Sequence, residues 1–84
     1  MTYTYATSGT CSRQIDFELD GNIIKNVVFT GGCHGNLQGI SKLVEGMNAE
    51  EAIQRLRGIC CGSKPTSCPD QLTIALEEAV KAQQ

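Results

Sequence analysis

Residues 13–30, with the sequence RQIDFELDGNIIKNVVFT, decide the fold of this chain. From position 13 to position 19 the residues alternate, with apolar side chains at 15, 17 and 19 on one side and polar ones at 14, 16 and 18 on the other. This is the period-two pattern of a strand with one buried face. Asp20 and Gly21 then indicate a turn, and the β-branched residues of 23–30 predict a returning strand. The stretch therefore predicts a β-hairpin, whose first strand buries Ile15, Phe17 and Leu19.

The residues on either side of the hairpin predict the remaining elements. Tyr3, Tyr5 and Thr7 alternate with their neighbours, so we expect a third strand there. After the hairpin, apolar residues at helical spacing predict three helices. One follows Asn36 and stops at Gly46, one is capped by Asn48 and ends near Gly58, and one is capped by Ser67 or Cys68 with Pro69 in its first turn. Inside the first helix, Gly39 is expected to allow close packing.

Strands followed by helices predict an α+β fold, in which a small antiparallel sheet is covered on one face by the three helices. The chain has 84 residues, so we expect a single domain over 1–84 with one core. Aromatic residues make up 5% and there is no Trp, so that core must be built mainly from aliphatic side chains. A chain of this length cannot hold a large catalytic barrel.

Composition argues against several classes of function. The net charge is −2 and the seven Lys and Arg residues are scattered, which predicts no direct nucleic-acid binding. There is no apolar run long enough to cross a bilayer, and residues 1–5 lack the character of a secretion signal, so we expect a cytoplasmic protein. Paired carboxylates, phosphate loops and dinucleotide fingerprints are missing, so the residues predict no catalytic set.

Five cysteines are many for a chain of this size, and their odd number in a reducing compartment favours metal ligation or thiol chemistry over disulfides. Each one falls at a predicted element boundary, where rigid scaffolds usually present ligands. Any single cysteine could instead be a small buried apolar residue. The five are Cys11, Cys33, Cys60, Cys61 and Cys68.

Cys68 is the strongest candidate, because a helix N-terminus stabilises a thiolate and lowers the thiol pKa. The alternative is that residues 66–70 are only a well-capped helix start. Cys33 lies in a glycine loop, and the adjacent His34 is a reserve ligand. Cys60 and Cys61 are neighbours whose side chains should diverge, so only one is expected to be a ligand.

Residues 66–72, Thr-Ser-Cys-Pro-Asp-Gln-Leu, are similar to the signature of the TSCPD domain family, and so are the stretches at 32–33, 36–37, 41–47 and 58–62. The resemblance covers nearly the whole chain. It implies a domain that occurs alone or at the C-terminal end of adenosylcobalamin-dependent ribonucleotide reductases, with cysteines that bind metal. It also implies a link to ribonucleoside-diphosphate reductase and to deoxyribonucleotide supply for DNA synthesis. The chain itself is too short for the reductase's barrel, nucleotide pocket or cobalamin site.

The order of elements also resembles the iron-sulfur scaffold proteins of the NifU and IscU type. Carried over by position, Cys11, Cys33 and Cys68 fall on the three scaffold cysteines, which implies an IscU-like fold. The sequence departs from that pattern at Arg13, where the scaffold has Asp, and it lacks the scaffold's Leu-Pro-Pro-Val segment. Cys61 would add a fourth thiolate and favour a closed, stable site.

These inferences lead to one hypothesis with two alternatives. The chain is expected to be a metal-binding accessory domain that uses Cys11, Cys33, Cys61 and Cys68 to hold zinc or an iron-sulfur cluster, both of which accept four thiolates. Its expected partner is a ribonucleotide reductase or another protein, and its oligomeric state stays open. The alternatives are a thiol-redox partner that uses Cys60, Cys61 and Cys68, and an iron-sulfur cluster scaffold.

Overall fold

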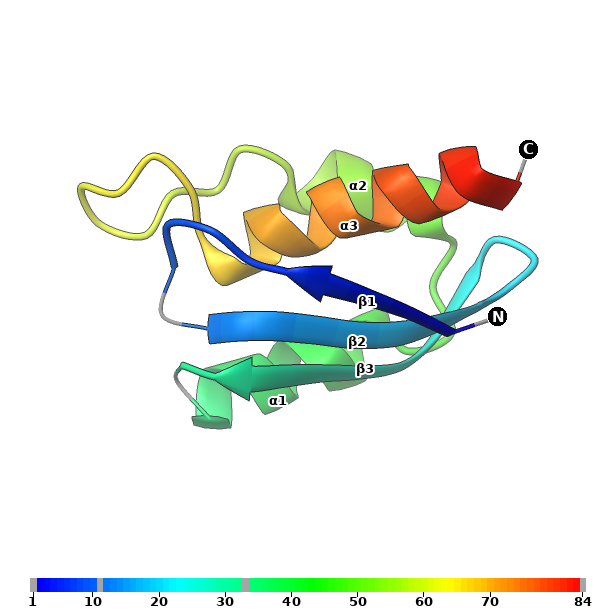
Figure 1. Cartoon of the computed structure of the whole chain (residues 1–84), viewed down its shortest axis with the longest axis horizontal. Helices are drawn as coiled ribbons and strands as arrows, with labels where there is room; N and C mark the ends of the chain where they lie inside the picture. The colour runs from blue at the N-terminus through cyan, green and yellow to red at the C-terminus, as the bar shows by residue number, and fades with distance from the viewer. Residues whose placement is uncertain (1, 11, 33, 84) are drawn as a thin grey trace.

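The computed structural model describes residues 2–10, 12–32 and 34–83, the last range without the His34 side chain. The described residues form three strands and three helices (Figure 1). In chain order these are β1 (Thr2–Ala6), β2 (Ser12–Asp20), β3 (Ile23–Gly31), α1 (His34–Val44), α2 (Ala49–Leu56) and α3 (Cys68–Gln83). The predicted α+β fold is confirmed.

The sheet is antiparallel with the order β1-β2-β3, so the predicted hairpin and the predicted third strand are both present. Asp20 pairs with Ile23, which leaves a two-residue turn between β2 and β3. Gly21 opens that turn with a φ of 62°, a conformation in which a side chain would be strained. The turn residue predicted from sequence therefore has a backbone reason to be glycine.

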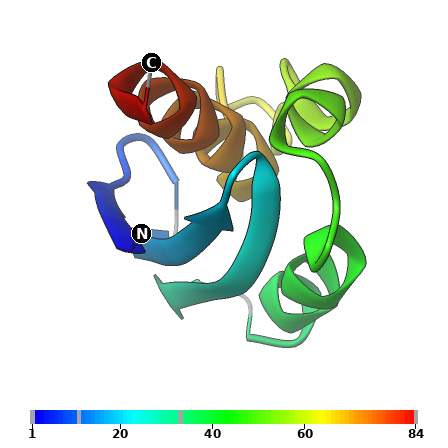
Figure 2. The ribbon, with the colours of Figure 1, turned by 90° about the vertical axis from the view of Figure 1, so that its right-hand side faces the viewer.

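The core lies between the inner face of the sheet and the helices. Ile15, Phe17 and Leu19 are at most 2% exposed, as their alternation predicts. They pack in one cluster with Leu72 and Leu76 of α3. Figure 2 shows α2 and α3 on one side of the sheet and α1 alongside β3. The chain thus buries one face of β2 and leaves polar residues on the other.

The helix ends agree with sequence in part. Asn48 caps α2, because its side chain accepts a hydrogen bond from the Glu50 backbone N–H at 2.9 Å. The first helix begins at His34, before the predicted cap Asn36. The expectation that Gly39 allows close packing is wrong, because a Cβ built there would meet no described atom within 4 Å.

An irregularity in β2 positions the residues of the candidate site. Ser12 pairs with Gly31 while Gln14 pairs with Thr30, so Arg13 is an extra residue in β2. Such a bulge changes which face the following side chains point to. With strict alternation, Ser12 would share the outer face with Gln14, but it is buried and only 3% exposed. The bulge therefore turns Ser12 inward.

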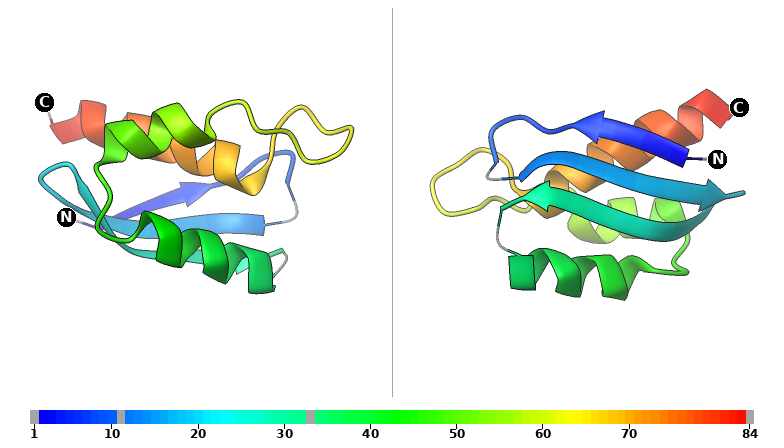
Figure 3. Two further views of the ribbon diagram at one scale, coloured as in Figure 1. Left: turned by 180° about the vertical axis from the view of Figure 1, so that it is seen from behind. Right: turned by 60° about the horizontal axis from the view of Figure 1, so that its bottom comes forward.

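One end of the molecule gathers segments that are far apart in sequence. In Figures 1 and 3 the β1–β2 connection, the end of β3, the start of α3 and residues 57–67 lie at this end, on the left of Figure 1. We call residues 57–67, which join α2 to α3, the cysteine loop. No helix in the described part of the chain is long and apolar enough to cross a membrane.

Candidate thiol site

Cys68 is the first residue of α3, and its position follows from the local sequence. Ser67 is the cap, because its Oγ accepts a hydrogen bond from the Asp70 backbone N–H at 3.2 Å. Pro69 fits the first turn, where a backbone N–H is not needed. Cys68 is 7% exposed and lies at the positive end of the helix dipole. The predicted helix start is confirmed, with Ser67 rather than Cys68 as the cap.

The Cys68 sulfur lies 3.1 Å from Ser12 Oγ, and both residues are buried. Either atom could donate in this hydrogen bond. The contact joins the start of α3 to the start of β2, 56 positions apart in sequence. Sequence reasoning missed Ser12. The sequence did contain a signal for it. Strict alternation in β2 would place the charged Arg13 on the buried face, and a mismatch of this kind indicates a bulge.

The other proposed ligands on this side, Cys11 and Cys33, lie outside the described residues, as does the His34 side chain. Their described neighbours can be placed. Ser12 directly follows Cys11, and it pairs with Gly31, two residues before Cys33. The pairing of β2 with β3 and the contact of Ser12 with Cys68 therefore bring the flanks of three cysteine-bearing segments to one place.

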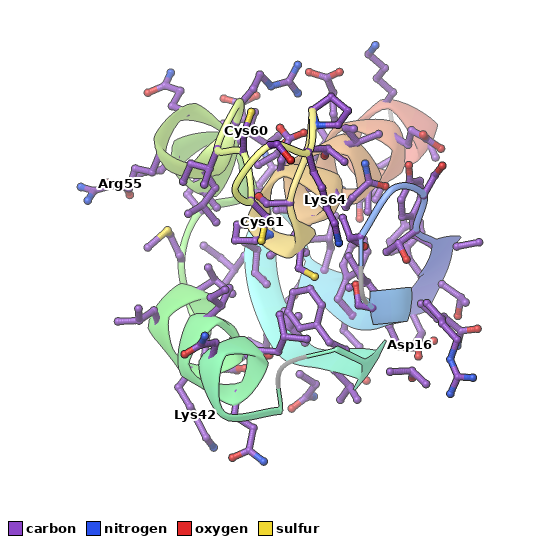
Figure 4. All side chains as sticks on the ribbon, turned by 90° about the vertical axis from the view of Figure 1, so that its left-hand side faces the viewer. Asp16, Lys42, Arg55, Cys60, Cys61 and Lys64 are labelled. Carbon is purple, nitrogen blue, oxygen red and sulfur yellow. The ribbon has the colours of Figure 1, made fainter. Side chains whose placement is uncertain are left out.

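The cysteine loop orients its two cysteines differently, as expected for adjacent residues. The Cys60 sulfur lies 3.6 Å from the carbonyl oxygens of Gly58 and Pro65, to which its S–H can donate. Cys61 is held through its backbone, because its N–H donates to the Thr66 carbonyl at 3.1 Å. Both side chains are exposed. Figure 4 shows Cys60 at the outer rim of this end of the molecule and Cys61 nearer its middle.

Asp70 joins the cysteine loop to α3. Its Oδ1 accepts the Gly58 backbone N–H at 2.7 Å, and its Oδ2 accepts the Thr66 hydroxyl. The hydrogen bond from Thr66, followed by that from Gly58, lowers the pKa of the Asp70 carboxyl below its ordinary value. Ser67 adds another link, because its hydroxyl donates to the Ile59 carbonyl. The start and the end of the loop are thus tied to the same helix turn.

Gln71 connects this turn to the β1–β2 connection. Its Oε1 accepts the Ser8 backbone N–H and its Nε2 donates to Thr66 Oγ1, both at 3.1 Å. Gly9 lies so close that an added Cβ would be 3.2 Å from the Thr66 methyl group. The hydrogen bonds of residues 66–71 therefore join the cysteine loop, the start of α3 and the β1–β2 connection. Within this stretch, Cys68 contributes the thiol.

The described residues do not by themselves form a metal-binding group. Within 2–10, 12–32 and 34–83, no three His, Cys, Asp or Glu side chains come together as metal ligands. Of the four proposed ligands, these ranges contain Cys61 and Cys68. The predicted ligand set of Cys11, Cys33, Cys61 and Cys68 is therefore untested by the geometry and stays a prediction.

The fold and this site define a small α+β domain with thiols at one end. A family model described as the TSCPD domain matches residues 1–80, and the chain belongs to the TSCPD domain family. Comparisons with curated proteins and with solved structures found no match. The family assignment made from residues 66–72 is confirmed, whereas the resemblance to IscU stays a prediction.

Proposed function

We propose that this TSCPD domain is a metal-binding accessory domain. Its ligands would be Cys11, Cys33, Cys61 and Cys68, and its metal would be zinc or an iron-sulfur cluster. The observation that carries the proposal is the buried contact between Cys68 and Ser12, because it joins the helix that presents one thiol to the strands that flank two others. Four thiolates are a donor set that both kinds of centre use.

The surroundings of Cys68 fit a ligand better than core filler. A cysteine that only filled space would be expected among apolar side chains. Cys68 instead contacts a hydroxyl that also lies 3.2 Å from Thr10 Oγ1, so the sulfur faces a hydrogen-bonded polar group. Polar groups of this kind orient thiolate ligands and adjust their basicity. A helix N-terminus adds further stabilisation of negative charge on the sulfur.

Cys61 is the better fourth ligand of the adjacent pair. The Cys60 thiol is directed at two carbonyl oxygens of its own loop, at the outer rim. Cys61 lies nearer the middle of the end that Cys68 shares, and its hydrogen bonds to other described residues use its backbone alone. A metal held there would link the exposed cysteine loop to the sheet. His34 remains the reserve ligand.

Membership in the TSCPD family supports an accessory role in ribonucleotide reduction. Such domains also occur at the end of adenosylcobalamin-dependent ribonucleotide reductases, so we propose a reductase as partner and deoxyribonucleotide supply as the process served. The described residues form one small sheet with three helices, and the radical reaction would belong to the partner's barrel. The proposed contribution of this chain is its metal centre.

The test is metal analysis of protein purified without air and without chelator, combined with an absorption spectrum. Zinc would give about one equivalent and no colour, whereas an iron-sulfur cluster would give iron, sulfide and visible absorption. Cys68→Ser and Cys61→Ser should lower the metal content, and Cys60→Ser is the matched control that should retain it. Fully folded wild-type protein that holds no metal would refute the proposal.

A thiol-redox role is the second candidate, because Cys60 and Cys61 are adjacent and exposed. Thiols on an accessible loop can exchange with a partner's disulfide. This role predicts that the thiols of the cysteine loop are oxidised and reduced reversibly at a defined glutathione ratio, in protein that contains no metal. A cluster scaffold, the third reading, predicts transfer of the coloured cluster to an acceptor protein.

A further inference from the structure

We infer that Asp70 is a positioning residue that fastens the cysteine loop to the first turn of α3 and so presents Cys61 to the metal centre. The inference rests on the proposed function. It assigns the acidic residue of the family signature a specific task, which is to act on the centre through another residue rather than to bind the metal.

The first step is that burial does little to hold the cysteine loop. Every residue from 59 to 65 is exposed, so this stretch has little apolar contact with the core. Segments of this kind open locally at low free energy unless hydrogen bonds hold them. The position of Cys61 therefore depends on the bonds at the ends of the loop.

The second step is that one carboxylate holds both ends. Asp70 accepts the backbone N–H of Gly58, near the start of the loop, and the hydroxyl of Thr66, near its end. Hydrogen bonds to an ionised carboxylate are shorter and stronger than those between neutral groups. The distance from the Gly58 nitrogen to Oδ1 is 2.7 Å, which is in the range of such bonds. Removing this carboxylate would therefore remove two of the hydrogen bonds that hold the ends of the loop.

The third step is that helix capping does not account for this arrangement. An acidic residue in a first helical turn ordinarily acts on the helix end itself, but Ser67 already caps α3. Asp70 reaches out of the helix to a backbone group twelve positions away. Gln71 fixes the orientation of the Thr66 hydroxyl by donating to it, so Thr66 can donate to Asp70. The hydrogen bonds of Asp70 thus hold the cysteine loop against the helix and do not cap the helix itself.

The fourth step connects the loop to ligation. A ligand on a loop that is already ordered binds with a smaller loss of conformational freedom. Residues that orient metal ligands typically change metal affinity by about 10- to 100-fold when they are mutated. We therefore expect Asp70→Ala to weaken Zn²⁺ binding by about that factor, through Cys61.

The experiment uses the full chain and compares Asp70→Ala and Asp70→Asn with a matched control, Asp16→Asn. Asp16 also accepts two side-chain hydrogen bonds, but on the outer face of the sheet. Zn²⁺ affinity is measured by competition with a chelator. Amide hydrogen exchange of the metal-free protein is measured at Cys61, with Phe17 in the core as internal reference. Asp70→Asn keeps one acceptor oxygen, so it remains informative if the alanine variant does not fold.

We expect weaker Zn²⁺ binding in both Asp70 variants, with exchange at the Cys61 amide accelerated more than exchange at Phe17. Asp16→Asn should leave Zn²⁺ affinity unchanged and should not accelerate exchange at Cys61 more than at Phe17. In a Cys61→Ser background, Asp70→Ala should cause little further loss of affinity, because the two residues act through one ligand. Wild-type protein that binds Zn²⁺ while the Asp70 variants bind it equally well would overturn the positioning role alone. Wild-type protein that binds no Zn²⁺ would overturn this inference, and wild-type protein that in addition copurifies with no iron-sulfur cluster would overturn the proposed function as well.

Discussion

Replacing Ser67 with alanine should destabilise the domain through two separate bonds. Its Oγ accepts the Asp70 N–H and its hydroxyl donates to the Ile59 carbonyl. Loss of a serine cap costs about 1 kcal/mol. The second bond contributes about 0.5–1 kcal/mol, at the low end because the exposed Ile59 lets water replace the hydroxyl. The expected loss is therefore about 1.5–2 kcal/mol.

Urea denaturation followed by circular dichroism measures this free energy of unfolding directly. In a domain of this size, a loss of 1.5–2 kcal/mol also lowers Tm by roughly 6–16 °C. Ser63→Ala, in the exposed part of the same loop, is the control and should change stability by less than about 0.5 kcal/mol. Ser67→Thr keeps both bonding functions and should restore most of the loss. Equal stability of Ser67→Ala and Ser63→Ala would refute this explanation of the helix start.

Three further predictions test the fold. Leu72→Ala, at a fully buried position, should lower the free energy of unfolding by about 2–5 kcal/mol, whereas Leu43→Ala, at a side chain that is 77% exposed, should change it by less than about 0.5 kcal/mol. Gly39→Ala should stabilise the domain by about 0.5–1 kcal/mol, because the added Cβ meets open space in a helix. Gly46→Ala should destabilise it by about 1–2 kcal/mol, because Gly46 has a φ of 80°. Thermal unfolding of the two variants should therefore show a higher Tm for the first and a lower Tm for the second. Hydrogen bonds from neighbouring side chains lower the pKa of Asp16. Its contribution to stability is therefore present above the ordinary carboxyl pKa and lost as the pH falls through the lowered value, so Asp16→Asn should lose less stability than wild type between about pH 6 and pH 3 in parallel urea titrations.

Sequence was sufficient for the elements whose pattern is local. The alternation of Ile15, Phe17 and Leu19 predicts the buried face of β2, and the cap of α2 at Asn48 is readable because its side chain bonds within the same turn. The packing of Gly39 was predicted wrongly, since glycine in a helix has no unique local meaning. Only the tertiary arrangement shows that its surroundings are open.

The candidate site shows where local patterns fail. Sequence identified Cys68 and its place at the start of α3, because a cap, a proline and an acidic residue are adjacent. The contact of Cys68 with Ser12 depends on a bulge and on residues 56 positions apart, which periodicity does not encode. The hydrogen bond that the Gly58 N–H donates to Asp70 spans twelve positions and is likewise not encoded by periodicity. For this reason the roles of Ser12 and Asp70 emerge only from the fold.

The central claim is that thiolates from distant segments converge on one metal. X-ray absorption spectroscopy at the edge of the metal that copurifies with the anaerobically prepared chain tests it most directly, because the method identifies and counts the ligand atoms. If the metal is zinc, four sulfur ligands at about 2.3 Å are expected. The Cys68→Ser variant should lose one sulfur or the metal altogether. A shell made of oxygen and nitrogen atoms in the wild-type protein would contradict the proposed centre.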